Sequence, residues 1–170
     1  MAPVTIRIQT EGFDLGAEVQ ALRNGRLDVG AVASFVGVCR DHHPGQCAPG
    51  HVQAMELEHY PGMTERAIAQ MVEQAQQRWP LLGVTVIHRV GPLLPGDDIV
   101  LVAVASSHRG AAFAACEFLM DYLKTQAPFW KKETTPQGGH WVDARESDDA
   151  ALRRWGVASD NAQQGRAEKT

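Results

Sequence analysis

The sequence predicts a mixed α+β domain, and three observations lead to that fold class. Segments with the alternating or continuous apolar patterns of strands are interleaved with segments whose apolar residues recur at helical spacing. The 170 residues are 44% hydrophobic and 21% charged, which is typical of a globular chain long enough to bury a substantial core. The sequence contains no internal repeat or low-complexity block. We therefore expect one domain over residues 1–155, followed by a loose polar tail over 156–170.

The N-terminal part of the chain predicts a strand, a helix, a second strand and a loop, in that order. Residues 4–10 alternate between apolar and polar side chains and therefore predict a strand. Residues 14–22 carry apolar side chains at helical spacing and stop at an Asn-Gly pair, which indicates a short helix. Residues 29–40 are small, apolar and β-branched, as in a buried strand, whereas the Pro and Gly content of residues 41–50 indicates a loop.

The middle of the chain predicts a strand, a long helix and another strand. Residues 53–60 alternate cleanly between two faces and end at a Pro-Gly turn. Residues 67–79 carry an apolar stripe at helical spacing that a proline closes, and residues 84–90 again read as a strand. His59 and His88 fall within these strand patterns, so we interpret them as core histidines rather than catalytic groups.

The last third of the chain predicts a loop, a buried strand, a helix and an extended segment. Residues 91–98 contain the Pro and Gly of a loop, and residues 99–106 form a continuous apolar run. Apolar side chains at helical spacing predict a helix over residues 109–126. Residues 129–135 look extended, and residues 146–155 predict a last helix.

Charge and cysteine content exclude several classes of partner. Sixteen Lys and Arg stand against twenty Asp and Glu, so bulk attraction to nucleic acid or to an anionic membrane is not expected. The N-terminus lacks the pattern of a secretory signal, and no apolar run approaches the length of a membrane span. Cys39, Cys47 and Cys116 are an odd number without a close pair, which favours a reducing, cytoplasmic setting.

The stretch "SSHRG", residues 106–110, is the first candidate site. A buried strand ends there and a helix begins, with Ser106 or Ser107 placed to cap it. His108 and Arg109 would then lie at the positive end of the helix, where unpaired backbone N–H groups favour an anion. The alternative is a capped helix with two solvated polar residues.

The stretch "YLKTQAPFWKKE" holds three lysines around an apolar corner and is the second candidate. Lys124 lies in the last helical turn, where a cation meets the negative pole of the helix. In the extended segment, Lys131 shares a face with Phe129 and Glu133, while Lys132 points to the other face. Amines held close together and partly desolvated have lowered pKa values, and can act as acid, base or nucleophile near neutral pH. The alternative is a set of solvated lysines after a helix.

Arg40 and the loop that follows it form a third candidate region. Arg40 comes directly after a predicted core strand, at a position where mixed α/β folds often place functional groups. The segment 39–51 also contains residue types that bind zinc: Cys39, His42, His43, Cys47 and His51. It has no C-x-x-C knuckle and no rigid element, so a zinc-binding module is kept only as an alternative.

The spacing of the candidate cations limits how they can cooperate. His108 and Lys124 are sixteen positions apart, which is about 24 Å along a continuous helix. One small substrate cannot easily contact both ends. If both groups serve one site, we expect His108 and Arg109 of one subunit to face Lys124 and Lys131 of a second copy across a two-fold interface.

Four blocks of sequence resemble the catalytic large subunit of molybdopterin synthase: "LEHYPGMTERAI", "VIHRVGPLLPGDDIVLVAVASSHR", "FLMDYLKTQAPFWKKE" and "HWVDARES". The resemblance spans roughly residues 5–155. It implies an α/β hammerhead-like fold with an additional antiparallel β subdomain. It also implies a homodimer that binds one small ubiquitin-like sulfur carrier at each end, giving a heterotetramer.

The activity implied by this resemblance belongs to molybdenum cofactor biosynthesis. The C-terminal Gly-Gly thiocarboxylate of the carrier supplies sulfur to cyclic pyranopterin monophosphate, which becomes molybdopterin. Because the carrier delivers the sulfur, no metal or redox cofactor is expected in this chain. The sequence ends in "RAEKT" without Gly-Gly, so we do not expect it to be the carrier itself.

The resemblance also assigns site residues. Lys124 and Lys131 match the family's catalytic lysines, and which of them is acid, base or covalent partner is left open. The implied substrate-binding set consists of Val38, Cys39, Arg40, His108, Arg109, Lys124, Lys131, Lys132 and Glu133, with His108 and Arg109 supplied by the neighbouring subunit. The composition of loop 41–51 departs from the family pattern. The competing interpretations are another anion-processing transferase and a non-catalytic scaffold that docks a ubiquitin-like partner.

Overall fold

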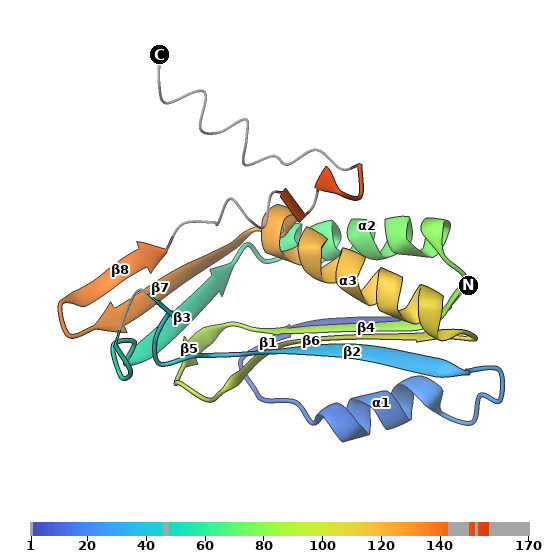
Figure 1. Cartoon of the computed structure of the whole chain (residues 1–170), viewed down its shortest axis with the longest axis horizontal. Helices are drawn as coiled ribbons and strands as arrows, with labels where there is room; N and C mark the ends of the chain where they lie inside the picture. The colour runs from blue at the N-terminus through green and yellow to red at the C-terminus, as the bar shows by residue number, and fades with distance from the viewer. Residues whose placement is uncertain (1, 46–47, 143–149, 152, 157–170) are drawn as a thin grey trace, which may run out of the picture.

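Two four-stranded sheets and three helices make up the described part of the chain, which comprises residues 2–45, 48–142, 150–151 and 153–156 of this computed structural model (Figure 1). The first sheet has the order β1 (Val4–Gln9), β4 (Leu81–Arg89), β6 (Asp98–Ser106) and β2 (Ala31–Val38). The second has the order β5 (Gly91–Leu93), β3 (Ala54–His59), β7 (Phe129–Thr135) and β8 (Gly138–Val142). The helices are α1 (Leu15–Arg23), α2 (Met63–Arg78) and α3 (Arg109–Gln126).

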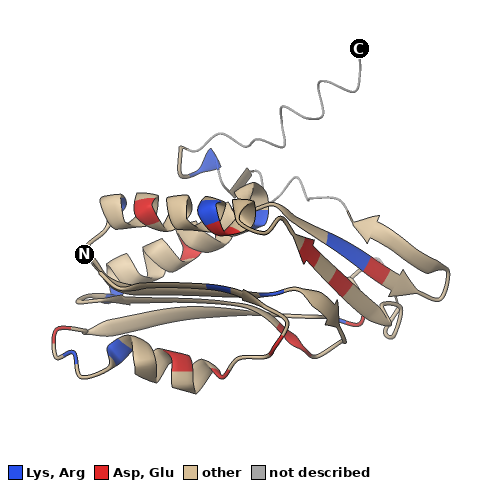
Figure 2. Ribbon diagram, turned by 180° about the vertical axis from the view of Figure 1, so that it is seen from behind, with Lys and Arg blue, Asp and Glu red and all other residues tan. Residues whose placement is uncertain are grey.

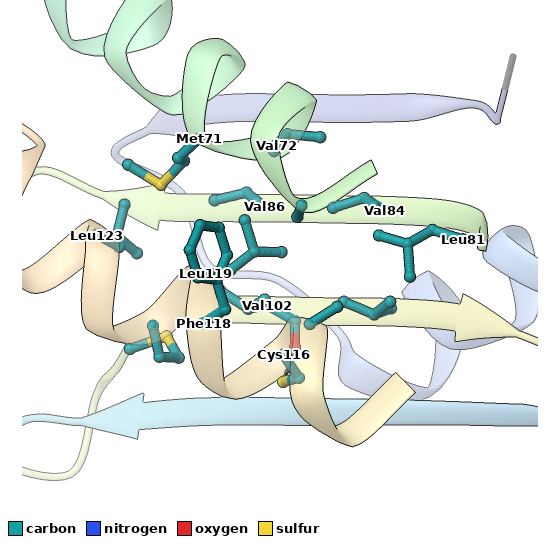
Figure 3. Packing of buried hydrophobic residues seen from close by; sticks show 14 of the residues in the cluster. Met71, Val72, Leu81, Val84, Val86, Val102, Cys116, Phe118, Leu119 and Leu123 are labelled. Carbon is teal, nitrogen blue, oxygen red and sulfur yellow. Dashed lines mark hydrogen bonds between the residues drawn. The ribbon is translucent and has the colours of Figure 1, made fainter. Parts of the chain in front are cut away.

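The first sheet is covered on both faces. Helices α2 and α3 lie on one face and α1 lies on the other (Figure 1). The larger core fills the space between α2, α3 and the sheet, with Phe118 and Leu119 fully buried among valines of β4 and β6 (Figure 3). A smaller cluster around Leu22 lies under α1. Because β4 and β6 are buried on both faces, their sequences read as continuous apolar runs.

Local chemistry sets the ends of the helices. Asp14 is the N-cap of α1, and its carboxylate accepts a hydrogen bond from the Ala17 N–H at 2.7 Å. The helix ends at Arg23 with Asn24 as its C-cap, and Gly25 follows with a positive φ of 74°. The Pro-Gly turn before α2 is likewise present, with the Glu65 carboxylate accepting from the Gly62 N–H at 2.6 Å.

Strand β2 corrects one expectation about burial. The composition of residues 29–40 predicts a buried strand, but β2 is the edge strand of its sheet and pairs only with β6. Ala33 is buried, whereas Phe35 is 40% and Val38 47% exposed. The strand itself is confirmed and its complete burial is wrong, because an apolar composition does not reveal whether a strand has neighbours on both sides.

The second sheet is wholly antiparallel and matches the expected β subdomain, so the mixed α+β fold class is confirmed. Residues 129–135 are confirmed as strand β7. Two short strands were not predicted: β5 lies inside the expected loop 91–98, and β8 follows the turn at Gly138. Neither has a clear alternating pattern, because β5 is three residues long and β8 is mostly exposed.

The C-terminal segment is described only in part. Of the expected helix 146–155, residues 150, 151 and 153 have helical backbone, and residues 146–149 and 152 lie outside the described residues. The expected tail lies outside them as well, from residue 157 onward. Trp155 packs edge-on against Trp79 and Phe118 at ring distances of 5.6 Å. Within the described chain, none of the helices has the length and apolarity needed to span a bilayer.

Candidate active site

A cavity of about 350 Å3 lies where the two sheets meet the C-terminal end of α3. Both sheets and the helix contribute to its wall, which includes Phe35, Val38, Arg40, Leu57, His88, Leu123, Lys124, Phe129 and Lys131. Figure 2 shows basic residues both on β7 and at the end of the helical layer next to it. The pocket is therefore a junction between elements that are far apart in the sequence.

Three cations from three different elements reach this cavity. Lys124 comes from the last turn of α3, Lys131 from the middle of β7, and Arg40 from the segment directly after β2. The lining residues among those described include no carboxylate. A chain with a formal net charge of −4 thus contains a local positive site, which can bind an anionic group.

The strand alternation predicted for β7 separates its two lysines. Lys131 lies on the same side as Glu133, and its Nζ is 3.7 Å from Glu133 Oε1. Glu133 is 4% exposed and does not line the cavity; it lies behind Lys131. Lys132 is exposed on the other side, opposite Glu56 in the β3–β7 register, with its Nζ 6.0 Å from the centre of the Trp141 ring. Lys132 is therefore outside the cavity that Lys131 lines.

His108 and Arg109 do not reach the cavity either. Both are exposed and lie at the far end of α3 from Lys124, because α3 is one unbroken helix of 18 residues. The predicted Ser cap is wrong: His108 occupies the N-cap position without a side-chain cap bond. Strand β6 continues through Ser106, whose buried hydroxyl donates to the Pro80 carbonyl at 2.9 Å.

The two residues before Arg40 have different environments. Val38 lines the cavity and is half exposed. Cys39 is 4% exposed and packs with Met55, Leu57 and Leu93 in the core of the second sheet. Burial raises the pKa of the Cys39 thiol, the charges of Asp97 and Glu133 raise it further, and the charge of Lys131 opposes them. Cys39 is therefore a core residue next to the site and does not line the cavity.

The zinc alternative finds no ligand set among the described residues. No group of three or more His, Cys, Asp or Glu side chains in that part of the chain could hold a metal ion. His42 is paired with Asp41, and His43 is paired with Glu133. Cys47 lies outside the described residues.

His88 is a cavity residue that the sequence interpretation assigned to the core. Its Nδ1 lies 2.8 Å from the Arg89 carbonyl oxygen, and its ring stacks on Phe129 with centres 3.9 Å apart. Burial lowers the pKa of His88 to about 4, with the charges of Lys124 and His59 adding to the effect and the Arg89 hydrogen bond opposing it. His88 is therefore a neutral imidazole in the wall of a cationic cavity. The only sequence signal for it is a polar ring within an apolar strand.

A half-enclosed cavity with convergent cations and apolar walls is typical of an enzyme that binds an anionic organic substrate. Comparison with known proteins identifies the family within this class of enzymes. Residues 8–126 match the MoaE protein family, and the chain belongs to this family.

Relatives and solved structures agree with that assignment. The chain is 64% identical over 158 residues to the molybdopterin synthase catalytic subunit of Ralstonia nicotianae, covering 93% of this chain and 88% of the relative. Its structure resembles the molybdopterin biosynthesis MoaE protein from Burkholderia ambifaria, with a TM-score of 0.76 and 62% identity over 92% of this chain and 99% of that one. Molybdopterin synthase from Staphylococcus aureus is similar at a TM-score of 0.71 and 30% identity, over 81% and 96% of the two chains. The predicted family, fold and enzyme class are confirmed.

Proposed function

We propose that this chain is the catalytic subunit of a molybdopterin synthase, a sulfurtransferase that converts cyclic pyranopterin monophosphate to molybdopterin. The sulfur comes from the C-terminal thiocarboxylate of a small ubiquitin-like carrier. Beyond family membership, one observation carries this proposal: Arg40, Lys124 and Lys131 line a single cavity whose described wall has no carboxylate. Such a site suits a substrate that bears a phosphate and a donor that bears a thiocarboxylate.

The cavity cations have distinct roles in this proposal. The Arg40 guanidinium offers a two-pronged set of donors to the phosphate. Lys124 and Lys131 are the catalytic amines: one protonates the phosphate oxygen that departs, and the positive field of both stabilises the oxyanion that forms at the carrier carbonyl. Val38 contributes an apolar contact beside them. Of the other substrate-binding predictions, Cys39 and Glu133 support the wall from behind, and Lys132 lies outside it.

The proposed assembly has two kinds of subunit. The description "catalytic subunit" carried by the relatives implies a further subunit, and the ubiquitin-like carrier fills that place. We also propose a homodimer, and hence a heterotetramer, in which His108 and Arg109 complete the cavity of the partner copy. The length of α3 supports this arrangement, because it keeps these residues about 24 Å from Lys124 within one chain.

The proposed setting is the cytoplasm, which the two buried free thiols, Cys39 and Cys116, favour. Within the chain, the catalytic domain is proposed to span residues 1–155, with residues 156–170 as a tail. Neither nucleic acid nor membrane is a proposed partner, since the sixteen Lys and Arg of the chain are outnumbered by twenty Asp and Glu.

A defined reconstitution tests the proposed function. Purified chain, thiocarboxylated carrier and cyclic pyranopterin monophosphate are mixed, and the dithiolene product is measured. The natural chain is expected to form product, and Lys124→Ala and Lys131→Ala are each expected to lose at least about a hundredfold in rate. Arg66→Ala is the matched control, because Arg66 is an exposed cation on α2.

Three outcomes of the reconstitution are informative. Full activity in both lysine variants rejects the site assignment. Tight carrier binding without any product supports the non-catalytic scaffold instead. Product from a different phosphorylated substrate, with none from the pterin, supports another anion-processing transferase.

A further inference from the structure

The loop after β2 places His43 against β7. The Nε2 atom of His43 is 2.8 Å from Glu133 Oε1 and 3.1 Å from Glu133 Oε2, across 90 positions of sequence. The His43 side chain is 17% exposed and that of Glu133 is 5% exposed. Both distances are within the range of a hydrogen bond donated by an imidazole N–H to a carboxylate.

The same carboxylate is the ion-pair partner of Lys131. Its Oε1, which is close to His43, is 3.7 Å from Lys131 Nζ, and His140 Nε2 is 3.9 Å from Oε2. Both of these distances are longer than a hydrogen bond. Lys131 therefore pairs only loosely with Glu133, and its side chain, 33% exposed, remains part of the cavity wall.

The physical consequence is a competition for one buried carboxylate. A buried carboxylate needs hydrogen-bond donors, and leaving it without one is strongly unfavourable. If His43 no longer donated to Glu133, the ammonium of Lys131 would be the nearest strong donor. We expect Nζ to move from 3.7 Å to about 2.8 Å from the carboxylate, the usual length of a charge-assisted hydrogen bond. That movement would draw the amine out of the cavity.

We propose that His43 is a positioning residue for the catalytic site: it occupies the Glu133 carboxylate so that the Lys131 amine stays presented to the substrate. His43 does not line the cavity, so it acts through Glu133. This inference rests on the proposed function, because it assumes that Lys131 takes part in sulfur transfer. It gives the loop after β2 a role in the active site.

Steady-state kinetics in the reconstituted assembly, chain plus thiocarboxylated carrier, provide the test. His43→Ala is expected to lower kcat about tenfold with KM little changed, because the amine is displaced while the phosphate contacts remain. His43→Gln retains an N–H donor and is expected to recover most of the loss. The adjoining His42 is the matched control, since it pairs with Asp41 and does not contact Glu133, so His42→Ala is expected to stay within about twofold of the natural chain.

A double variant separates positioning from a general structural effect. If His43 acts only through the carboxylate, His43→Ala combined with Glu133→Gln is expected to be no slower than Glu133→Gln alone. Losses that multiply would overturn the proposal, and so would a His43→Ala rate equal to that of His42→Ala. A crystal structure of His43→Ala adds a readout independent of activity. Lys131 Nζ at hydrogen-bonding distance from Glu133 supports the proposal, and an unchanged separation contradicts it.

The same assay distinguishes failure of this inference from failure of the proposed function. An inactive natural chain, or a fully active Lys131→Ala variant, rejects the function or its site whatever His43 does. A natural chain that forms product, with an impaired Lys131→Ala and an unimpaired His43→Ala, rejects only the positioning role. Thermal unfolding of each variant shows whether it is folded. If His43→Ala does not fold, the positioning role is judged from the rate of His43→Gln, compared with the rates of Glu133→Gln and of the natural chain.

Discussion

His88 shows how a single buried side chain can differ from its usual chemistry. Its Nδ1–H donates to the Arg89 carbonyl, so the remaining nitrogen, Nε2, is an acceptor. The His88 ring lines the cavity, so a cavity whose cations only donate also has a neutral imidazole in its wall.

The pKa of His88 predicts a contribution to the pH dependence of stability. Because burial lowers this pKa to about 4, the unfolded chain binds this proton more readily than the folded one. The stability from a neutral His88 is therefore complete above the unfolded pKa of about 6.5 and is lost as pH falls towards 4. The free energy of unfolding is expected to fall by roughly 2.5 kcal/mol from this group between about pH 7.5 and pH 4.5.

Urea unfolding of the natural chain and of His88→Phe at those two pH values measures this contribution. Phe keeps an aromatic ring against Phe129 and cannot be protonated, so the variant is expected to lose less stability on acidification. Equal losses in both proteins would contradict the assignment of a neutral, buried His88.

The Cys116 thiol gives a second prediction at the scale of one residue. Burial raises its pKa to about 11, and the side chain is 7% exposed on the inner side of α3. Because the thiolate is the reactive form, alkylation of Cys116 at pH 8 is expected to be about a hundredfold slower in the folded chain than in urea. Mass spectrometry of the peptide that contains Cys116 measures both rates, and similar rates would show that the thiol is accessible.

At the scale of elements, the start of β2 depends on a close approach to the end of β6. The Gly30 N–H donates to the Ser106 carbonyl at 3.0 Å, and a Cβ at residue 30 would lie 2.1 Å from the Ser107 carbonyl oxygen. Backbone atoms cannot yield as a flexible side chain can. Only glycine therefore allows the edge strand to meet β6 at this point.

Gly30→Ala is expected to reduce the free energy of unfolding by at least about 2 kcal/mol, because the backbone must shift and the hydrogen bond to Ser106 is lost. Gly110→Ala is the matched control: a Cβ there has no atom within 4 Å, and residue 110 lies in the first turn of α3. Alanine in a helix is favourable by up to about 1 kcal/mol, so the control is expected to be neutral or stabilised. Urea midpoints compare the two variants, and equal effects would refute the role of the close approach.

At the scale of the whole molecule, α3 acts as a spacer between two sets of cations. Lys124 belongs to the cavity, whereas Arg109 begins the same helix at its opposite end. The proposed homodimer brings the Arg109 of one copy to the cavity of the other. In a mixed dimer of a Lys124 variant and an Arg109 variant, both defects therefore fall in the same cavity and the other cavity is natural, so the two variants should complement each other.

Subunit exchange between Lys124→Ala and Arg109→Ala tests this arrangement. After exchange, half of all dimers contain one copy of each variant. Each of these dimers has one cavity in which both residues are natural, so about one quarter of natural activity is expected. Lys124→Ala mixed with Lys131→Ala is the control, because every cavity then lacks a lysine. A first mixture no more active than its parents would show that Arg109 does not serve the partner copy.

The sequence by itself determined the type and order of most elements. Periodicity predicts a strand over residues 4–10 and a helix over 109–126, and residues 129–135 look extended; β1, α3 and β7 agree with these bounds within one or two residues. Period-two alternation also placed Lys131 beside Glu133 and turned Lys132 away from them. These features are local: the spacing of apolar residues and the positions of Pro and Gly decide them. The family resemblance identified from sequence blocks is confirmed as well.

Only the tertiary structure decided which distant residues meet. The shared cavity of Arg40, Lys124 and Lys131, the contact between His43 and Glu133, and the neutral state of His88 depend on sheet order and register. The same is true of the edge position of β2 and of the pairing of the short strands β5 and β8. Local patterns record which face of an element is buried, but they do not record what lies against it. Through-space partners and desolvation arise only when the two sheets and α3 are packed together.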